Sequence, residues 1–439
     1  MTFQNTLAFA QSLDKSDPLS KFQSEFLFPM HNGAKAIYFC GNSLGLQPKS
    51  VRSAINAELD YWEKYGVEGW FSGDKAWLSY HQELSELAAP IVGAKPSEVI
   101  MMNTLTVNLH LLMVSFYRPT PQRFKIIIEA GAFPSDQYAL ETQVRFHGFD
   151  PSVSIIEIAP RDGEHCLRTE DIVQTIENEG DTVALVLFGG INYYTGQFYD
   201  LEKIAETAHK IGATVGFDLA HAAGNVPLQL HDWQADFAVW CGYKYLNSGP
   251  GGIGGAFIHE KHHTNKDLSR FAGWWGHDEQ QRFKMEKGFI PMSGAAGWQL
   301  STVQVIPSAM HRASLRLIEQ VGGMGVLRHK SIQLTLFLEA VLKASNQKFE
   351  IITPSVINDS TEPNPTLSSV LSNFNIENAQ ARGAQLSILT DENGKKLFDK
   401  LAENGVICDW REPNVIRLAP VPLYNSFEEV WRVGQLLNS

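Results

Sequence analysis

A series of short apolar segments, each bounded by turn residues, constrains the fold of this chain more than any other feature. Buried strands are expected at four segments rich in β-branched or other apolar residues: 153–158, 183–188, 214–217 and 237–240. A further strand is expected at 125–129, and a helical stretch at 201–211 separates two of the later strands. Strands that alternate with helices form βαβ units. The sequence therefore predicts an α/β fold with a mainly parallel sheet.

The rest of the first 305 residues fits the same pattern. Helices are expected at 4–26, 48–64, 79–91 and 107–116 and from 133 onward, and short strands at 36–40 and 99–102. Parallel sheets bind ligands at the carboxyl ends of their strands. Several candidate site residues follow such predicted ends: Leu105, Thr106, Phe133–Asp136, Asp218, His221, Tyr243 and Lys244. We expect a binding site at this edge of the sheet.

The pattern changes after residue 305. Long amphipathic helices are expected at 307–322 and 328–345, followed by strands at 349–352, 368–373, 385–389 and 415–418 and helices at 394–403 and from 426. This order is typical of a smaller α+β domain. We therefore predict a large domain over 46–305, a small C-terminal domain over 306–439, and an N-terminal segment, 1–45, that packs with the small domain.

Composition and charge exclude several classes of protein. The chain has 439 residues, of which 44% are hydrophobic and 19% charged, so it can build a large core. Its formal net charge of −12 gives no basic footprint for nucleic acid. The N-terminus has no signal-peptide pattern, and no apolar stretch is long enough to span a bilayer. We expect a cytoplasmic protein with no membrane or nucleic-acid partner.

The four cysteines are far apart in the sequence: Cys40, Cys166, Cys241 and Cys408. They form no CxxC or Cys/His metal spacing, so no metal site is expected. Few scattered cysteines fit a reducing compartment. Cys241 lies three residues before Lys244, and we interpret it as a buried apolar thiol rather than a functional one.

Lys244 and Asp218 carry the strongest chemical signal. Each ends or follows an apolar run, and Lys244 is followed by a glycine-rich stretch. A lysine can hold an aldehyde as a Schiff base, and an aspartate can keep a pyridine nitrogen protonated. Pyridoxal phosphate needs both groups. Taken alone, Lys244 could be a surface lysine and Asp218 a helix N-cap; together they favour the cofactor.

Four other residues have a functional and a structural interpretation that the sequence leaves open. Thr106 could help bind a phosphate at a helix start, or simply cap that helix. Phe133 could stack on an aromatic cofactor, or belong to the core. His221 could pack beside the cofactor ring, or be structural. Arg417, a charge inside an apolar strand, could pair with a substrate carboxylate or with a structural one.

The glycine-rich segment 249–255 does not match either nucleotide-binding loop pattern. Its spacing predicts a tight, closely packed turn into a strand.

Longer motifs add a resemblance to a known family. They lie at 38–48, 103–112, 133–136, 194–197, 218–222, 242–247, 273–277 and 416–425. Together these segments resemble those of kynureninases over about residues 35–435. The resemblance implies a fold-type I pyridoxal-phosphate enzyme, similar to aspartate aminotransferase and aminotransferase class V, with a seven-stranded sheet. It also implies a homodimer with a shared active site.

The resemblance implies an activity as well. Kynureninases hydrolyse L-kynurenine to anthranilate and L-alanine, or 3-hydroxykynurenine to 3-hydroxyanthranilate and L-alanine, in tryptophan breakdown and pyridine nucleotide synthesis. Lys244 matches the Schiff-base lysine, and Tyr243 a phosphate contact and general acid. Further cofactor contacts are implied for Leu105, Thr106, Phe133, Pro134, Ser135, Asp136, Asp218 and His221, with Trp274 and Thr302 donated by the second subunit. Arg417 matches the anchor of the substrate carboxylate, with Asn42 and Ser43 near the substrate.

The sequence departs from the family pattern at three places. Gly189 stands where relatives often carry Ser or Thr near the phosphate. The segment 65–68 lacks a histidine that animal relatives place there, and Thr302 replaces their asparagine. The last two changes remove polar partners for a ring 3-hydroxyl, so kynurenine is favoured over 3-hydroxykynurenine.

Two alternatives remain open at this point. Another fold-type I enzyme, such as a transaminase or a cysteine-desulfurase relative, would share the Lys/Asp pair, but a desulfurase needs a reactive cysteine on a loop. A non-catalytic protein that binds pyridoxal phosphate would keep that pair and lose substrate groups such as Arg417.

Overall fold

The computed structural model describes residues 4–73, 76–265, 267–356 and 381–438. The expected strand at 368–373 lies outside these residues. The chain forms two compact units: unit 1 comprises Met1–Lys49, Ile191–Phe198 and Gln320–Ser439, and unit 2 comprises Ser50–Gly190 and Tyr199–Glu319. The domain boundaries expected at 45/46 and 305/306 stay a prediction.

Unit 2 is built on a seven-stranded sheet, which confirms the expected α/β class. The strand order is β6-β12-β11-β10-β9-β7-β8. The strands are β6 (Val99–Met101), β7 (Lys125–Glu129), β8 (Ile155–Ile158), β9 (Val183–Gly189), β10 (Thr214–Asp218), β11 (Phe237–Cys241) and β12 (Gly254–Ile258). Neighbouring strands from β8 to β11 are parallel, and β12 runs antiparallel to both of its neighbours. The sheet is thus mainly parallel, as expected.

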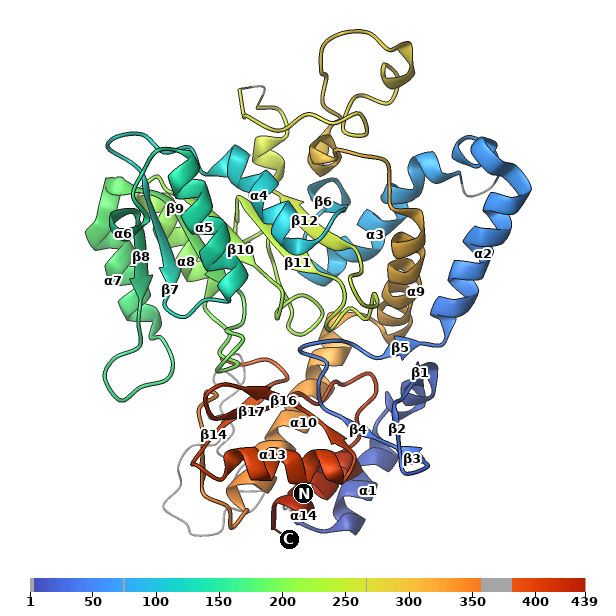
Figure 1. The fold of residues 1–439 in the computed structure, drawn as a ribbon, viewed down its shortest axis with the longest axis vertical. Helices are drawn as coiled ribbons and strands as arrows, with labels where there is room; N and C mark the ends of the chain where they lie inside the picture. Colours follow the sequence, from blue (N-terminus) through green and yellow to red (C-terminus); the bar gives the residue numbers. More distant parts are fainter. Residues whose placement is uncertain (1–3, 74–75, 266, 357–380, 439) are drawn as a thin grey trace. The chain divides into compact units, whose positions relative to one another are not determined.

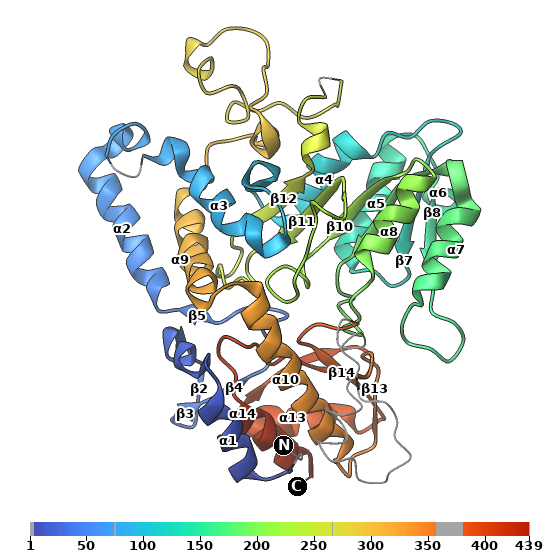
Figure 2. The same cartoon turned by 180° about the vertical axis from the view of Figure 1, so that it is seen from behind.

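Helices cover both faces of this sheet. Figures 1 and 2 show α4 (Leu105–Phe116) and α5 (Pro134–Phe146) on one face and α7 (Thr169–Glu179) and α8 (Leu201–Lys210) on the other. The right-handed rule for parallel crossovers explains this division, because β6-α4-β7 and β7-α5-β8 move one way along the sheet and β8-α7-β9 and β9-α8-β10 move back. Buried apolar residues of the strands and of α4 and α5 form a core on the first of these faces.

The remaining elements of unit 2 are helical. They are α2 (Ser50–Tyr65), α3 (Tyr80–Val92), α6 (Pro151–Ser154) and most of α9 (Val305–Val321), with short 3₁₀ turns between them. The expected strand at 153–158 is shorter than predicted, because Pro151 opens α6 with Asp150 as its N-cap. The expected helix at 107–116 begins two residues earlier, at Leu105.

Unit 1 contains a four-stranded antiparallel sheet of order β13-β14-β17-β16. Its strands are β13 (Phe349–Ile351), β14 (Leu386–Thr390), β16 (Asp409–Arg411) and β17 (Val415–Leu418). The helices α1 (Leu7–Ser16), α10 (Met324–Lys343), α13 (Gly394–Glu403) and α14 (Phe427–Asn438) pack with it around one core. The N-terminal β4 (Ile37–Tyr38) pairs in parallel with β15 (Val406–Ile407).

The helix expected at 4–26 is interrupted. α1 ends at Ser16, and Asp17 takes an extended conformation ahead of Pro18. A residue that precedes proline is disfavoured in the α region, which explains the break. A 3₁₀ turn at Ser20–Glu25 and the short β1 (Phe26–Leu27), paired with β5 (Gln47–Pro48), follow.

Candidate active site

Four neighbouring strands of the unit 2 sheet end in residues of chemical interest. β7, β9, β10 and β11 end at Glu129, Gly189, Asp218 and Cys241. These strands are parallel neighbours, so their carboxyl ends lie at one edge. The turn after β11 leads to Lys244, and α5 after β7 begins at Pro134. The structure therefore brings residues far apart in the sequence to one edge of the sheet.

Lys244 is buried at this edge, with 9% of its surface exposed. Its Nζ lies 2.9 Å from Nε2 of His221 and 5.8 Å from the centroid of the Phe133 ring. The sequence predicted His221 and Phe133 only as neighbours of a cofactor. The half-exposed Phe133 and the buried His221 thus both lie close to the amine of Lys244.

Asp218 is buried at the end of β10, and its Oδ1 accepts a hydrogen bond of 2.7 Å from the backbone N–H of Ala220. Residues 220–225 form turns rather than the short helix that the sequence suggested. Burial raises the pKa of the Asp218 carboxyl, while the Ala220 N–H and the charge of Lys244 oppose that rise. The carboxyl is held in place by the chain turn that follows the strand.

Two further carboxyl groups lie beside Asp218. Asp136, in the first turn of α5, is buried and shares a hydrogen bond with Asp218. Burial and the neighbouring Asp218 raise the pKa of Asp136 well above its usual range. Both oxygens of Glu129 accept from the backbone N–H of Gly189, at 3.1 and 3.2 Å, and burial raises the pKa of Glu129 to about 8. Two of these acids therefore favour their neutral form at this edge.

Glu129 was not among the predicted site residues. The signal was present in the sequence, since Glu129 closes an isoleucine run, Ile126–Ile128, much as Asp218 closes its own apolar run. Its amide partner, Gly189, is one of the departures from the family pattern noted above. A main-chain N–H needs no side chain, so this contact is open to any residue other than proline at position 189.

The pKa of Glu129 makes stability depend on pH. Between its ordinary value of 4.5 and about 8, the folded chain keeps a proton that the unfolded chain has lost. Stability from this group is thus fully present below pH 4.5 and is lost as pH rises through about 8, by about 1.4 kcal/mol per pH unit. We expect Glu129→Gln to flatten the fall in melting temperature of the cofactor-free chain between pH 5 and 8.

The control for this measurement is Glu202→Gln, an equal change at an exposed residue of α8. Its melting profile should follow that of the wild type. If the melting temperatures of Glu129→Gln and of the wild type fell equally with pH, Glu129 would be ionised in both the folded and the unfolded chain.

The start of α4 offers backbone donors. Leu105 and Thr106 are its first two residues, and the side chain of the N-cap, Thr104, makes no capping hydrogen bond. The first amides of a helix lack intrahelical partners and favour an anion. Thr106 therefore lies inside the first turn rather than before it, and the position still suits a phosphate. Pro134 and Ser135 begin α5, where the Ser135 hydroxyl lies 3.5 Å from Asp136.

Tyr243 and Cys241 lie one and three residues before Lys244 in the chain. Burial, with the neighbouring Cys241, raises the pKa of Tyr243 to about 12, so the phenol keeps its proton. Burial also raises the pKa of the Cys241 thiol, and that of Cys40 to about 11. A thiolate is the reactive form of cysteine. These two cysteines therefore lack the character that a desulfurase needs.

Glycines around Lys244 allow close packing of the chain, as the segment 249–255 predicted. A Cβ on Gly242 would lie 2.5 Å from the carbonyl oxygen of Ile253 and from Oγ of Ser248. Gly249 has φ of +88°, which disfavours any L side chain. The turn that carries Lys244 is thus fixed by contacts that larger residues would not allow.

A second group of predicted residues lies in unit 1. Arg417, in β17, is fully buried. Its Nη1 donates to the carbonyl oxygen of Tyr193 at 2.7 Å, and its Nη2 donates to Oγ of Ser43 at 3.2 Å and to Oδ2 of Asp409 at 2.5 Å. Oδ2 of Asp409 also accepts from Arg411 at 3.2 Å and from the Ser43 hydroxyl. The structure therefore brings Arg417 and Ser43 into direct contact, and Asp409 accepts hydrogen bonds from both.

Asn42 is buried in the same unit. Its Nδ2 donates to Oε1 of Gln385 at 2.9 Å, and Nε2 of Gln385 donates to the carbonyl oxygen of Tyr193 at 3.0 Å. Oδ1 of Asn42 has no hydrogen-bond partner among the described residues. A buried acceptor of this kind suits a ligand donor. Asp409 and Gln385 were not predicted, although Asp409 follows the short apolar run Val406–Cys408.

Trp274 and Thr302 are exposed in unit 2. Nε1 of Trp274 donates to the carbonyl oxygen of Arg282 at 3.2 Å, and its ring packs against Trp275 and Phe283. The ring remains 45% exposed. The expected contribution of Trp274 and Thr302 to the active site of a second subunit stays a prediction.

One cluster has the side chains of a metal site. Ligand atoms of Glu98, His231 and His259 lie within 4.8 Å of one another. Glu98 already accepts from the backbone N–H groups of Lys95 and Glu260, each at 2.9 Å. Nδ1 of His259 accepts from the Lys261 N–H at 3.1 Å. These bonds to the backbone explain the cluster as structural.

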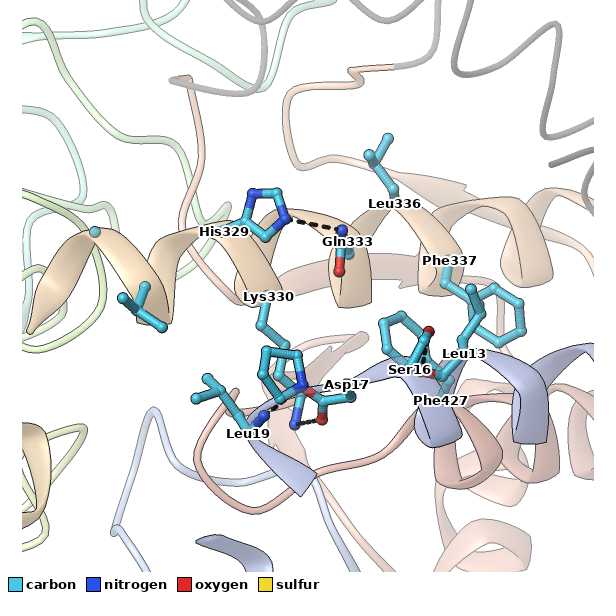
Figure 3. Close-up of a pocket in the computed structure, with 13 residues that line it drawn as sticks. Leu13, Ser16, Asp17, Leu19, His329, Lys330, Gln333, Leu336, Phe337 and Phe427 are labelled. Carbon is cyan, nitrogen blue, oxygen red and sulfur yellow. Dashed lines mark hydrogen bonds and ion pairs between the residues drawn. The ribbon is translucent and has the colours of Figure 1, made fainter. Parts of the chain in front are cut away.

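A cavity of about 540 Å³ lies in unit 1 between α1, α10 and the start of α14 (Figure 3). It is mostly apolar, with Leu336, Phe337 and Phe427 among its lining residues. A buried ion pair of 2.7 Å joins Lys330 of α10 to Asp17 at its wall. None of the lining residues is a predicted site residue, and the ion pair explains how the end of α1 is held to α10.

The groups at the carboxyl edge fit pyridoxal phosphate by their chemistry. A buried amine, a buried acid, an aromatic ring and an uncapped helix start supply partners for an aldehyde, a ring nitrogen, a ring face and a phosphate. The family model for aminotransferase class V matches residues 37–376. Fold and site together define a pyridoxal-phosphate-dependent protein of aminotransferase class V.

Sequence comparisons narrow the class. The model for the kynureninase C-terminal domain matches residues 366–437. Kynureninase from Flavobacterium psychrophilum is 52% identical, over 100% of this chain and 98% of that protein. Kynureninase from Nematostella vectensis is 48% identical, over 98% of this chain and 93% of that protein. The chain belongs to the kynureninase family.

Solved structures share the fold. Cysteine desulfurase from Thermococcus onnurineus NA1 has a TM-score of 0.74 at 18% identity and covers 96% of this chain and 97% of its own. The cystine C-S lyase C-DES, in complex with cysteine persulfide, has a TM-score of 0.72 at 18% identity, over 92% of this chain and 97% of its own. At such identity the likeness shows the fold alone. No described helix is both long and apolar enough to cross a membrane.

Proposed function

We propose that this chain is a pyridoxal-phosphate-dependent hydrolase that cleaves the Cβ–Cγ bond of L-kynurenine to give anthranilate and L-alanine. The observation that carries the reaction is the identity of 52% to a kynureninase along the whole chain. The cluster of Lys244, His221, Phe133 and Asp218 supports the cofactor. Tryptophan breakdown and pyridine nucleotide synthesis are the contexts in which this reaction is used by the family.

When bound, pyridoxal phosphate supplies an aldehyde for a covalent link and a ring that accepts electrons. Lys244 would hold the aldehyde carbon, and Asp218 would keep the ring nitrogen protonated. Phe133 would stack on the ring face, with His221 beside it. The phosphate would be held by Leu105, Thr106, Ser135 and Tyr243, and in a dimer by Trp274 and Thr302.

The protein's own groups would then move the protons. The amine of Lys244, once released, takes the α-proton of the substrate. Water adds to the γ-carbonyl before the carbon–carbon bond breaks. Tyr243 gives a proton to the β-carbon of the alanine product, and its raised pKa of about 12 supports this role, because the phenol is protonated at neutral pH.

Arg417 would bind the substrate carboxylate, with Asn42 and Ser43 as nearby polar partners. Arg417 suits that role because guanidinium and carboxylate form two parallel hydrogen bonds. Two features support kynurenine as the preferred substrate over 3-hydroxykynurenine: the segment 65–68 lacks the histidine that animal relatives carry there, and Thr302 replaces their asparagine.

The proposal is tested by incubating the purified chain with pyridoxal phosphate and L-kynurenine and following the fluorescence of anthranilate. We expect product with L-kynurenine and a lower kcat/KM with 3-hydroxykynurenine. If the cofactor binds but no product forms, the proposed reaction is contradicted. Only the assignment to the pyridoxal-phosphate-dependent class then stands. A transaminase would instead need a keto acid as co-substrate, which the assay omits.

We also propose a homodimer with a shared active site and a cytoplasmic location. The exposed ring of Trp274, close to exposed Phe283 and Met285, supports an interface on this part of unit 2. Sedimentation should give twice the 48.9 kDa of one chain. A species of 48.9 kDa with full activity would contradict the shared site.

A further inference from the structure

The guanidinium of Arg417 already donates hydrogen bonds to groups of the chain itself. It carries five N–H donors: one on Nε and two on each Nη. One Nη1 donor goes to the carbonyl oxygen of Tyr193. The two donors of Nη2 match its two acceptors, Oγ of Ser43 and Oδ2 of Asp409. Nη2 is therefore saturated.

Nη2 is the nitrogen that a carboxylate needs most. A carboxylate binds a guanidinium at two points, either across Nη1 and Nη2 or across Nε and Nη2. Both pairs include Nη2. A substrate carboxylate therefore gains a two-point contact only after Ser43 or Asp409 leaves this nitrogen.

Of the two acceptors on Nη2, Asp409 is the one that presents a carboxylate, as the substrate does. It lies directly opposite Arg417 in the antiparallel pair of β16 and β17, with its side chain 10% exposed. The same oxygen, Oδ2, also accepts from Nη2 of Arg411, whose side chain is 38% exposed. The cluster thus holds two guanidinium groups and one carboxylate, and its net charge of +1 matches one further carboxylate.

We propose that Asp409 is an internal competitor, which occupies the substrate-carboxylate position on Arg417 and pairs with Arg411 alone when that carboxylate binds. This inference rests on the proposed role of Arg417 and goes beyond it. Arg411 provides the second partner that keeps the displaced charge of Asp409 compensated. An uncompensated charge in a buried cluster is strongly unfavourable.

The consequence is a lowered affinity for any ligand that carries a carboxylate. Asp409→Asn removes the competing charge and keeps the shape of the side chain. We expect the dissociation constant of L-alanine, measured by spectral titration of the cofactor-loaded enzyme, to fall by about fivefold or more. KM for L-kynurenine should fall in parallel. L-Alaninamide, which has the amine but no carboxylate, should bind with unchanged affinity.

Two variants complete the test. Asp399→Asn makes the same change on the exposed face of α13 and should leave all constants unchanged. Arg411→Gln removes the second partner of Asp409, so the dissociation constant of L-alanine should rise. In the Asp409→Asn background, Arg411→Gln should have no effect, because Arg411 acts through Asp409. A double-mutant cycle measures this coupling directly.

The outcomes are distinguishable. An Asp409→Asn variant that binds L-alanine more weakly would overturn the proposal, as would equal changes for L-alanine and L-alaninamide. If Arg411→Gln still changes the dissociation constant of L-alanine in the Asp409→Asn background, Arg411 acts on the ligand directly, and the proposal is also overturned. If Asp409→Asn does not fold, Arg411→Gln decides: tighter binding of L-alanine by this variant contradicts the competition. Failure to cleave L-kynurenine would instead overturn the proposed function, whereas L-alanine binding would still report on Asp409.

Discussion

Lys244→Ala is expected to abolish turnover and to remove the visible absorbance of lysine-bound pyridoxal phosphate. Alanine has no amine to bond the aldehyde or to take the α-proton. Loss of a positioned acid–base group alone costs about 10²–10⁴-fold in rate, and loss of the covalent link adds to it. We expect kcat to fall by about 10⁴-fold or more. The measurements are the absorbance spectrum after dialysis and the anthranilate fluorescence.

Lys210→Ala is the matched control, because Lys210 is an exposed lysine of α8 in the same unit. It should keep both the absorbance and the rate. A Lys244→Ala variant with the wild-type spectrum would remove this residue from the site, and the proposal would then need another lysine.

Arg417→Ala is expected to weaken substrate binding while the cofactor stays bound. Truncating one partner of a buried charge pair costs about 2–5 kcal/mol, or roughly 30-fold to several thousand-fold in kcat/KM. The loss should appear mainly in KM, because the carboxylate itself neither gains nor loses a bond in the reaction. The cofactor spectrum separates this result from a general loss of structure.

Arg417→Lys serves as the milder variant. It keeps the charge inside β17 but cannot form two parallel hydrogen bonds. We expect a rise in KM with little change in melting temperature. Unchanged KM in both variants would show that Arg417 is the structural partner of Asp409 and nothing more, an alternative that the sequence left open.

The sequence predicted the part of the site that depends on local pattern. Asp218 and Lys244 stand out because each ends or follows an apolar strand, and strand ends of a parallel sheet share one edge. Phe133 follows from the same rule. The contacts of His221 and of the Phe133 ring with Lys244, at 2.9 and 5.8 Å, follow because the strands before these residues end at one edge of the sheet.

Residues that depend on pairing between distant segments were missed. Asp409 lies in β16, a strand of three residues with an alternation too short to detect, and it becomes important only by standing opposite Arg417. Glu129 gains its character from burial beside Asp218, which lies 89 residues further along the chain. The sequence predicts a strand end at 129 but not what lies beside it.

Local features of the sequence explain where the predicted helices and strands differ from the observed ones. A helix over 4–26 is favoured by its apolar spacing, but Pro18 divides it. The helix α7 was not predicted, although the acidic Glu170 and Asp171 in its first turn and Gly180 at its C-cap are helix signals. Strand direction was also inaccessible, and β12 runs against its neighbours.

The strand order β11-β10-β9-β7 has a consequence for how the chain matures. Residues of the candidate site enter from the ends of strands that are synthesised between Lys125 and Cys241, and the edge is complete only when all four are paired. A ligand that binds only the native state stabilises that state by mass action. Pyridoxal phosphate is therefore expected to stabilise the fully paired sheet, and its addition should raise the melting temperature of the chain.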